Sequence, residues 1–130
     1  MLLNSKGMIR NICHQRNNQL ALLCAAMVLF SFAPWHHGWS SYDQTKTLKF
    51  NAKIIEMAYE NPHGMIKIEV EKKKWTVVLA PPSRMESRGL TRDMLKVGTS
   101  VAVVGYPHIK IKDEMRAERV TVGDKTIELR

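Results

Sequence analysis

The sequence predicts a mainly β protein, a small five- to six-stranded OB-like Greek-key barrel with a short helix between its third and fourth strands. Three observations support this fold class: apolar and polar residues alternate in short runs after residue 47, turn residues separate the runs, and one polar stretch interrupts them. Five or six short strands with a helix inserted at that point match the plan of the OB fold. Small sandwiches and SH3-like barrels show a similar pattern and remain alternatives.

The first three strands are expected to form a meander. Alternating apolar residues predict a strand over 48–54, a second over 65–70 after a turn, and a third over 75–80 after three lysines. Pro81-Pro82 ends the third strand, because proline has no N–H to donate to a neighbouring strand. The polar stretch 83–88 that follows is expected to be irregular or a single helical turn.

A short helix and three further strands complete the predicted barrel. Thr91 offers a hydroxyl cap and Gly98 a stop, so a short helix is expected between them. Apolar alternation then predicts strands over 99–106 and 115–122, and the turn at Gly123-Asp124 leads to a last short strand over 126–129.

The N-terminal segment has the features of an export signal. The run from Leu20 to Phe32 holds 13 residues without a charge, and three basic residues but no acidic one precede it. A membrane-spanning helix needs about 20 apolar residues, so the run suits a signal peptide better. Residues 1–33 are therefore predicted to be a signal peptide, or an uncleaved N-terminal anchor because Pro34 follows the expected cut. Both outcomes place the barrel in the periplasm or outside the cell.

Removing residues 1–33 changes what the composition allows. Both cysteines, Cys13 and Cys24, fall in that segment, so the remainder has neither disulfides nor thiolate chemistry. The remaining 97 residues carry 17 basic and 12 acidic residues, a net charge of +5. This length suits one domain, with an extended segment over 34–46 and the barrel over 47–130.

Five short motifs carry a resemblance to a known family. They are His36-His37-Gly38-Trp39-Ser40-Ser41-Tyr42, Glu60-Asn61-Pro62-His63-Gly64, Ala80-Pro81-Pro82-Ser83-Arg84, Arg88-Gly89-Leu90-Thr91 and Gly105-Tyr106-Pro107. With these motifs in this order, the chain resembles a family of small exported bacterial proteins of unknown function. The resemblance implies a secreted or periplasmic small barrel and no particular activity. In relatives the histidine pair directly follows the cleavage site, whereas Pro34 and Trp35 intervene here.

Histidines of the predicted mature chain are the candidate metal ligands: His36, His37, His63 and His108. Each lies beside a turn or a chain end, and turns at one rim of a small barrel can converge. Imidazole nitrogens without thiolates favour copper(II), nickel(II) or zinc(II), and copper is preferred on ligand type. The alternative is that these histidines hydrogen-bond loop backbone. The leading hypothesis is an exported protein that binds a transition metal ion.

A metal-free binding module is the second hypothesis, with an envelope protein or a small anionic molecule as its partner. Arg84, Trp39 and Tyr106 are its candidate ligand-binding residues, although Arg84 also has Glu86 and Asp93 within reach for an internal ion pair. A third hypothesis is an OB domain that binds single-stranded nucleic acid, since OB folds combine basic grooves with aromatic side chains on which bases stack. The predicted compartment and the 12 carboxylates argue against it.

Catalysis is not expected. The sequence has no carboxylate pair, serine elbow, His-Glu-x-x-His helix or phosphate-binding loop. Ser83 lacks a recognisable base, so it is interpreted as a loop cap. The sequence therefore predicts a protein that binds and not an enzyme.

Overall fold

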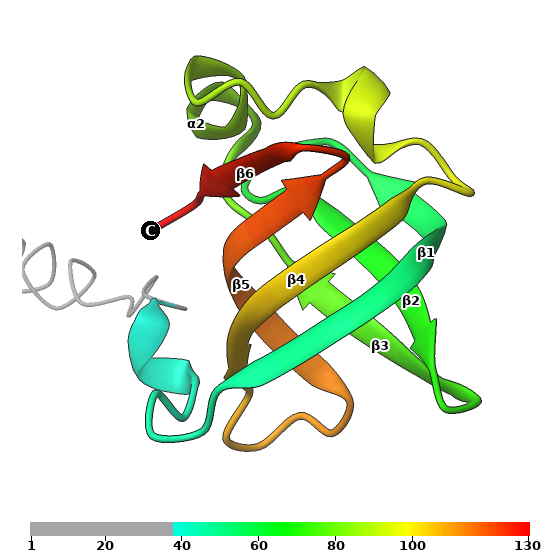
Figure 1. Cartoon of the computed structure of the whole chain (residues 1–130). Helices are drawn as coiled ribbons and strands as arrows, with labels where there is room; N and C mark the ends of the chain where they lie inside the picture. Colours follow the sequence, from blue (N-terminus) through cyan, green and yellow to red (C-terminus); the bar gives the residue numbers. More distant parts are fainter. Residues whose placement is uncertain (1–37) are drawn as a thin grey trace, which may run out of the picture. The chain divides into compact units, whose positions relative to one another are not determined.

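The computed structural model describes residues 38–130 (Figure 1). Its elements in chain order are the 3-10 helix η1 (Trp39–Ser41), the strands β1 (Leu48–Ala58), β2 (Met65–Val70) and β3 (Lys73–Val78), the helix α2 (Pro82–Ser87), the 3-10 helix η2 (Arg92–Leu95), and the strands β4 (Ser100–Pro107), β5 (Glu114–Val122) and β6 (Lys125–Glu128). The strands pair in the order β3-β2-β1-β4-β5-β6.

A parallel pairing between β3 and β5 closes the first five strands into a barrel, and β6 is added outside it. The pairing joins Thr76 to Glu114, Val77 to Met115 and Val78 to Arg116, while all other neighbouring strands are antiparallel. The helix α2 lies between β3 and β4 in the chain. The predicted OB-like barrel with a short helix between its third and fourth strands is thus confirmed.

Strand β1 pairs with two neighbouring strands and is longer than the strand that the sequence predicted. Its first half pairs with β4 and its second half with β2, and the pairing register shifts between Ile54 and Glu56. Such a bulge bends the strand, which lets one strand belong to both sides of a small barrel. The expected end at Ile54 is the position of this bulge, and the strand continues to Ala58.

Two further boundaries differ from the prediction. Strand β3 begins at Lys73, because Glu71 and Lys72 alone form the hairpin turn, with φ values of 50° and 65°. The expected helix before Gly98 is the single 3-10 turn η2, and the Thr91 side chain makes no capping hydrogen bond there. The polar stretch after Pro81 is the short helix α2, which begins at Pro82 because proline suits the first helical position.

The core fills the barrel and extends under the helices at one end. Inward residues of the strands alternate with outward polar ones, and Met85, Leu90 and Leu95 are fully buried where α2 and η2 cover that end (Figure 1). The largest fully buried side chains from the strands are Ile54, Ile66, Ile68, Val77, Val103, Met115 and Val120. Among residues 38–130, Tyr42 is the first buried apolar residue.

The two ends of the barrel carry different connections. Because β3 and β5 run parallel, both begin at the same end, so the β2–β3 turn and the β4–β5 loop lie together there (Figure 1). The helices α2 and η2 and the turn before β2 lie at the other end. Among residues 38–130, every helix is too short to span a bilayer.

Candidate functional site

Arg116 is a charged side chain held almost out of contact with solvent, 7 % exposed. Its neighbours Met115 and Ala117 point into the core, so strand alternation directs Arg116 to the outer face. The segment before β1 covers it there, with the guanidinium carbon 4.7 Å from the ring centroid of Trp39 and 6.0 Å from that of Tyr42. Both distances are those of cation–π contacts. Burial lowers the pKa of Arg116, and the charge of nearby Arg84 lowers it further.

His63 lies directly beside this buried guanidinium. It follows β1 in the turn before β2, and its Nε2 atom is 3.3 Å from the Nη2 atom of Arg116. Because a guanidinium only donates hydrogen bonds, Nε2 accepts and the proton of the neutral ring lies on Nδ1. Burial lowers the pKa of His63 below its ordinary value of 6.5, and the charges of Arg116 and Arg84 lower it further. The imidazole is therefore neutral at pH 7.

Arg84 completes a group of three cation-forming side chains, which we call the Arg–His cluster: His63, Arg84 and Arg116. Its charge lowers the pKa of both other members, so each of them experiences the electrostatic field of Arg84. Arg84 comes from α2, is exposed, and makes no ion pair within residues 38–130. The internal pairing with Glu86 or Asp93 considered from the sequence does not form; Asp93 pairs with Lys96 instead.

Trp39 connects the cluster to the C-terminal end of the chain. The guanidinium carbon of Arg130 lies 4.9 Å from the Trp39 ring, and Tyr106 meets the same ring edge-on at 6.1 Å. The Tyr106 hydroxyl donates to Glu118 Oε2 at 2.6 Å, and this bond raises the pKa of Tyr106. Glu118 Oε1 lies 3.7 Å from Arg130. Three residues were predicted from the sequence to bind a ligand: Arg84, Trp39 and Tyr106. Trp39 makes a cation–π contact with Arg116, Tyr106 lies opposite Arg116 on the neighbouring strand, and the charge of Arg84 lowers the pKa of Arg116.

His108 has a structural role in the loop after β4. Its Nδ1 atom accepts the backbone N–H groups of Lys110 at 3.0 Å and Ile111 at 2.9 Å, so the proton of the neutral ring lies on Nε2. Its ring meets that of Tyr42 at 5.0 Å, and the Tyr42 hydroxyl donates to Glu114 Oε1 at 2.8 Å. Burial of the Tyr42 hydroxyl, followed by its bond to Glu114, raises the pKa of Tyr42. His108 thus matches the loop-backbone alternative considered from the sequence.

The described part of the chain contains no group of three or more histidine, cysteine or carboxylate side chains placed to hold a metal ion. His36 and His37 lie outside the described residues. Metal binding through His36, His37, His63 and His108 therefore stays a prediction.

Sequence reasoning did not single out Arg116 or Tyr42 as site residues. Arg116 is one of several basic residues late in the chain, among them Arg119, which is exposed and pairs with Glu128. One available signal was its position between apolar Met115 and Ala117, which marks an outward arginine inside an otherwise buried stretch. The aromatic residues that cover it come from a segment more than 70 residues away in the sequence.

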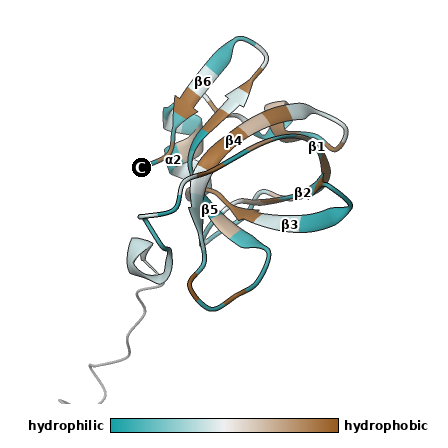
Figure 2. Ribbon diagram, turned by 60° about the horizontal axis from the view of Figure 1, so that its bottom comes forward, coloured by the Kyte–Doolittle hydropathy of each residue, from teal (hydrophilic) through white to brown (hydrophobic). Residues whose placement is uncertain are grey.

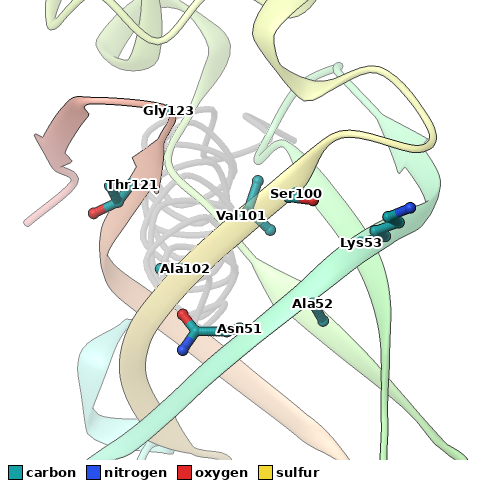
Figure 3. Close-up of a pocket in the computed structure, with 8 residues that line it drawn as sticks. All are labelled: Asn51, Ala52, Lys53, Ser100, Val101, Ala102, Thr121 and Gly123. Atoms are coloured by element: carbon teal, nitrogen blue, oxygen red, sulfur yellow. The ribbon is translucent and has the colours of Figure 1, made fainter.

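A separate shallow groove runs along the outer faces of β1, β4 and β5 (Figure 3). It has a volume of about 460 Å³ and is lined by Asn51, Ala52, Lys53, Ser100, Val101, Ala102, Thr121 and Gly123. Small side chains account for the hollow, and Lys53 is its single charged residue. None of the residues predicted from sequence to bind a ligand lines it, so the Arg–His cluster is the stronger candidate site.

The fold and the site are those of a small OB-like barrel with a cluster of two arginines and one histidine, in which the segment before the first strand covers Arg116. The chain belongs to a family of unknown function, DUF6152, whose family model matches residues 21–122. A search of curated proteins found no match.

The barrel is similar in part to solved structures of TiaS. One is the complex of TiaS with an isoleucine tRNA and ATP, with 16% identity and a TM-score of 0.46 over 68% of this chain and 20% of that one. Another is apo TiaS, a tRNA agmatidine synthetase, with 16% identity and a TM-score of 0.42 over 62% of this chain and 18% of that one. This chain spans about a fifth of the length of those proteins.

Proposed function

We propose that the protein is an exported binding protein, not an enzyme, and that the Arg–His cluster binds a small anionic ligand carrying carboxylate or phosphate oxygens. The observation that carries the proposal is the 3.3 Å contact between His63 and Arg116, and the charge of Arg84 lowers the pKa of both. Export is supported by the charge-free run that follows the basic N-terminal residues.

The hydrogen-bond donors of the Arg–His cluster are of the types that bind anions. Nε2 of His63 accepts from Arg116, so its Nδ1–H remains as a donor. Arg84 is exposed on α2 and offers a planar guanidinium that binds carboxylate or phosphate through two parallel hydrogen bonds. Arg116 adds a buried positive charge behind them, where screening by water is weak. A multiply charged oxyanion matches the donors of Arg84 and His63 and is attracted by the charge of Arg116.

Calorimetric titration of the full chain with citrate and with inorganic phosphate tests this proposal. Arg84→Ala should weaken binding roughly tenfold or more, about 1.4 kcal/mol, because the exposed charge-assisted hydrogen bonds are lost. Arg92→Ala is the matched control, since Arg92 is also exposed and lies on the neighbouring η2. Equal affinities for the wild-type and Arg84→Ala chains would contradict the proposal, as would equal losses in the two variants.

Transition-metal binding is the second candidate, and one observation favours it: the lowered pKa of His63 keeps its ring in the neutral form that binds metals. The two neighbouring guanidinium groups oppose a cation at the same place. Titration of the full chain with copper(II), nickel(II) and zinc(II) separates the candidates. Submicromolar one-to-one binding that is lost in His63→Ala would support a metal site, whereas the anion proposal expects His63→Ala to leave metal binding unchanged.

A further inference from the structure

Two isoleucines are exposed in the loop between β4 and β5. Ile109 is 60% exposed and Ile111 is 51% exposed, and they alternate with the exposed lysines Lys110 and Lys112. We call residues 109–112 the isoleucine loop. Two of the four exposed large hydrophobic side chains of the described residues thus fall within three positions. Exposed apolar side chains that gather in one place mark a contact surface more often than isolated ones do.

The backbone of this loop is held in place. His108 Nδ1 accepts the N–H groups of Lys110 and Ile111, and the His108 N–H donates to the Glu114 carbonyl at 2.9 Å. The Ile109 N–H donates to the Ser41 carbonyl, also at 2.9 Å. The fold therefore presents the isoleucines to solvent with a fixed backbone, although each could be buried only by another surface.

The same end of the barrel is basic. The β2–β3 hairpin end lies here because β3 and β5 begin together, and it carries the exposed Lys72, Lys73 and Lys74 with the acidic residues Glu71 and Glu69, the latter opposite Lys74. Figure 2 shows the hydrophobic segments of the isoleucine loop and the hydrophilic end of β3 on the face turned forward. Apolar side chains among several lysines are the combination that binds an anionic lipid surface, where each lysine is attracted to the headgroups.

The predicted export signal also bears on this end of the barrel, because few residues separate the two in the sequence. Ser41, which accepts the hydrogen bond from Ile109, is nine residues after Phe32, the end of the charge-free run. Nine residues reach at most about 30 Å. If the run is inserted in a membrane as an export signal or anchor, the length of the chain between Phe32 and Ser41 limits the distance between the isoleucine loop and the bilayer.

We propose that this end of the barrel docks on an anionic phospholipid surface, with Ile109 and Ile111 entering the interfacial layer and the lysines of both loops contacting the phosphates. This surface is distinct from the Arg–His cluster, because His63 and Arg84 come from connections at the other end of the barrel. The inference does not depend on the anion site.

A fluorescent label in the loop tests the proposal in the full chain. Cys13→Ser and Cys24→Ser remove the native thiols, and Ile111→Cys carries an environment-sensitive fluorophore. Vesicles of phosphatidylcholine alone serve as the control for binding through the N-terminal apolar run, and vesicles of phosphatidylcholine with phosphatidylglycerol test the added effect of anionic headgroups on the loop. We expect a blue shift of its emission on the anionic vesicles and little change on the zwitterionic ones.

Matched variants make the result specific. A label at Asp124→Cys, in the β5–β6 turn at the other end of the barrel, should not shift. Ile109→Ser should remove most of the shift, whereas Val97→Ser, which alters a 65% exposed side chain at the other end, should leave it intact. Arg84→Ala should also leave it intact, which keeps this test separate from that of the anion site.

Four results would overturn the proposal, and the first three concern the vesicles and the labelled positions. They are the absence of a shift on anionic vesicles, an equal shift on both kinds of vesicle, and an equal shift at the two labelled positions. A shift that grows with protein concentration without vesicles would also overturn it, and would assign the isoleucines to a contact between two copies of the chain.

Discussion

The guanidinium of Arg116 and the ring of Trp39 lie 4.7 Å apart, and this contact joins the strand that closes the barrel to the first turn of the described chain. The arginine is 7% exposed because Trp39 and Tyr42 cover it, and it holds His63 by its Nη2 atom. The short segment before β1 is therefore part of the site and not only a connection to the predicted signal.

Replacing Trp39 with alanine should expose Arg116 and remove two cation–π contacts, since Arg130 also lies against this ring. We expect the free energy of unfolding to fall by about 1 to 2 kcal/mol. Urea denaturation measures it. Trp39→Phe keeps an aromatic face and should lose about half as much. If Trp39→Ala is as stable as the wild type, the segment before β1 does not stabilise the barrel.

Gly105 occupies a position on β4 where a side chain does not fit. An added Cβ would collide with the backbone carbonyl of Arg116, at the point where the β4–β5 register shifts. Gly105→Ala should therefore push the two strands apart and lower the free energy of unfolding by about 2 to 3 kcal/mol. Gly38→Ala is the control, because nothing lies within 4 Å of its Cβ position. Thermal unfolding of both variants checks the prediction, and equal melting temperatures would contradict it.

The stability of the fold should depend on the protonation of His63. Its pKa in the folded state is lowered from 6.5 by burial and by Arg116 and Arg84, so the unfolded chain binds the proton more strongly. The contribution of His63 is therefore fully present above pH 6.5 and is lost as the pH falls through the lowered folded value. We expect the melting temperature to fall between pH 7.5 and 5.5, and to fall less in His63→Gln. An identical pH profile in the variant would contradict this cause.

The hydroxyl of Tyr42 should contribute more to stability than that of Tyr59. Tyr42 donates to the carboxylate of Glu114 at 2.8 Å, whereas Tyr59 donates to the neutral Leu90 carbonyl at 3.1 Å. Hydrogen bonds to charged groups contribute more, so Tyr42→Phe should cost about 2 kcal/mol and Tyr59→Phe about 1 kcal/mol. Chemical denaturation of the two variants compares them directly. A larger loss in Tyr59→Phe would contradict the prediction, since Tyr42 is both the more buried residue and the one bonded to a carboxylate.

Much of the fold could be predicted from the sequence because each strand has one buried face. Alternation at Val101 and Val103, and the stop at Gly98 with φ +90°, identified β4 within one residue at each end. The bulge in β1 could not be predicted, because Ile55 and Met57 are apolar and conceal the change of face. The turn at Glu71 and Lys72 was also missed, since neither is a residue that usually takes positive φ.

The site was less predictable than the fold because it depends on contacts between distant segments. Arg84, Trp39 and Tyr106 were named from their local motifs, and they are all linked to Arg116. Arg116 is buried because the segment before β1 covers the outer face of β5. The alternation of apolar and polar residues along a strand does not show which distant segment covers it. His63 and His108 share a residue type but have opposite proton positions, which follow from the guanidinium beside one and the backbone N–H groups beside the other.

The parallel pairing of β3 with β5 covers only Thr76–Val78, so the start of β3 has no partner on that side within the described residues. Unpaired strand edges can pair with another copy of the protein in concentrated solution. The start of β3 and the outer side of β6 are two of the places within residues 38–130 where strand backbone lacks a neighbouring strand. Lys73, Lys74 and Lys125 are exposed at these two places. Like charges would face each other whenever two barrels approached strand to strand, so intermolecular sheets are disfavoured and the purified barrel should resist forming fibres.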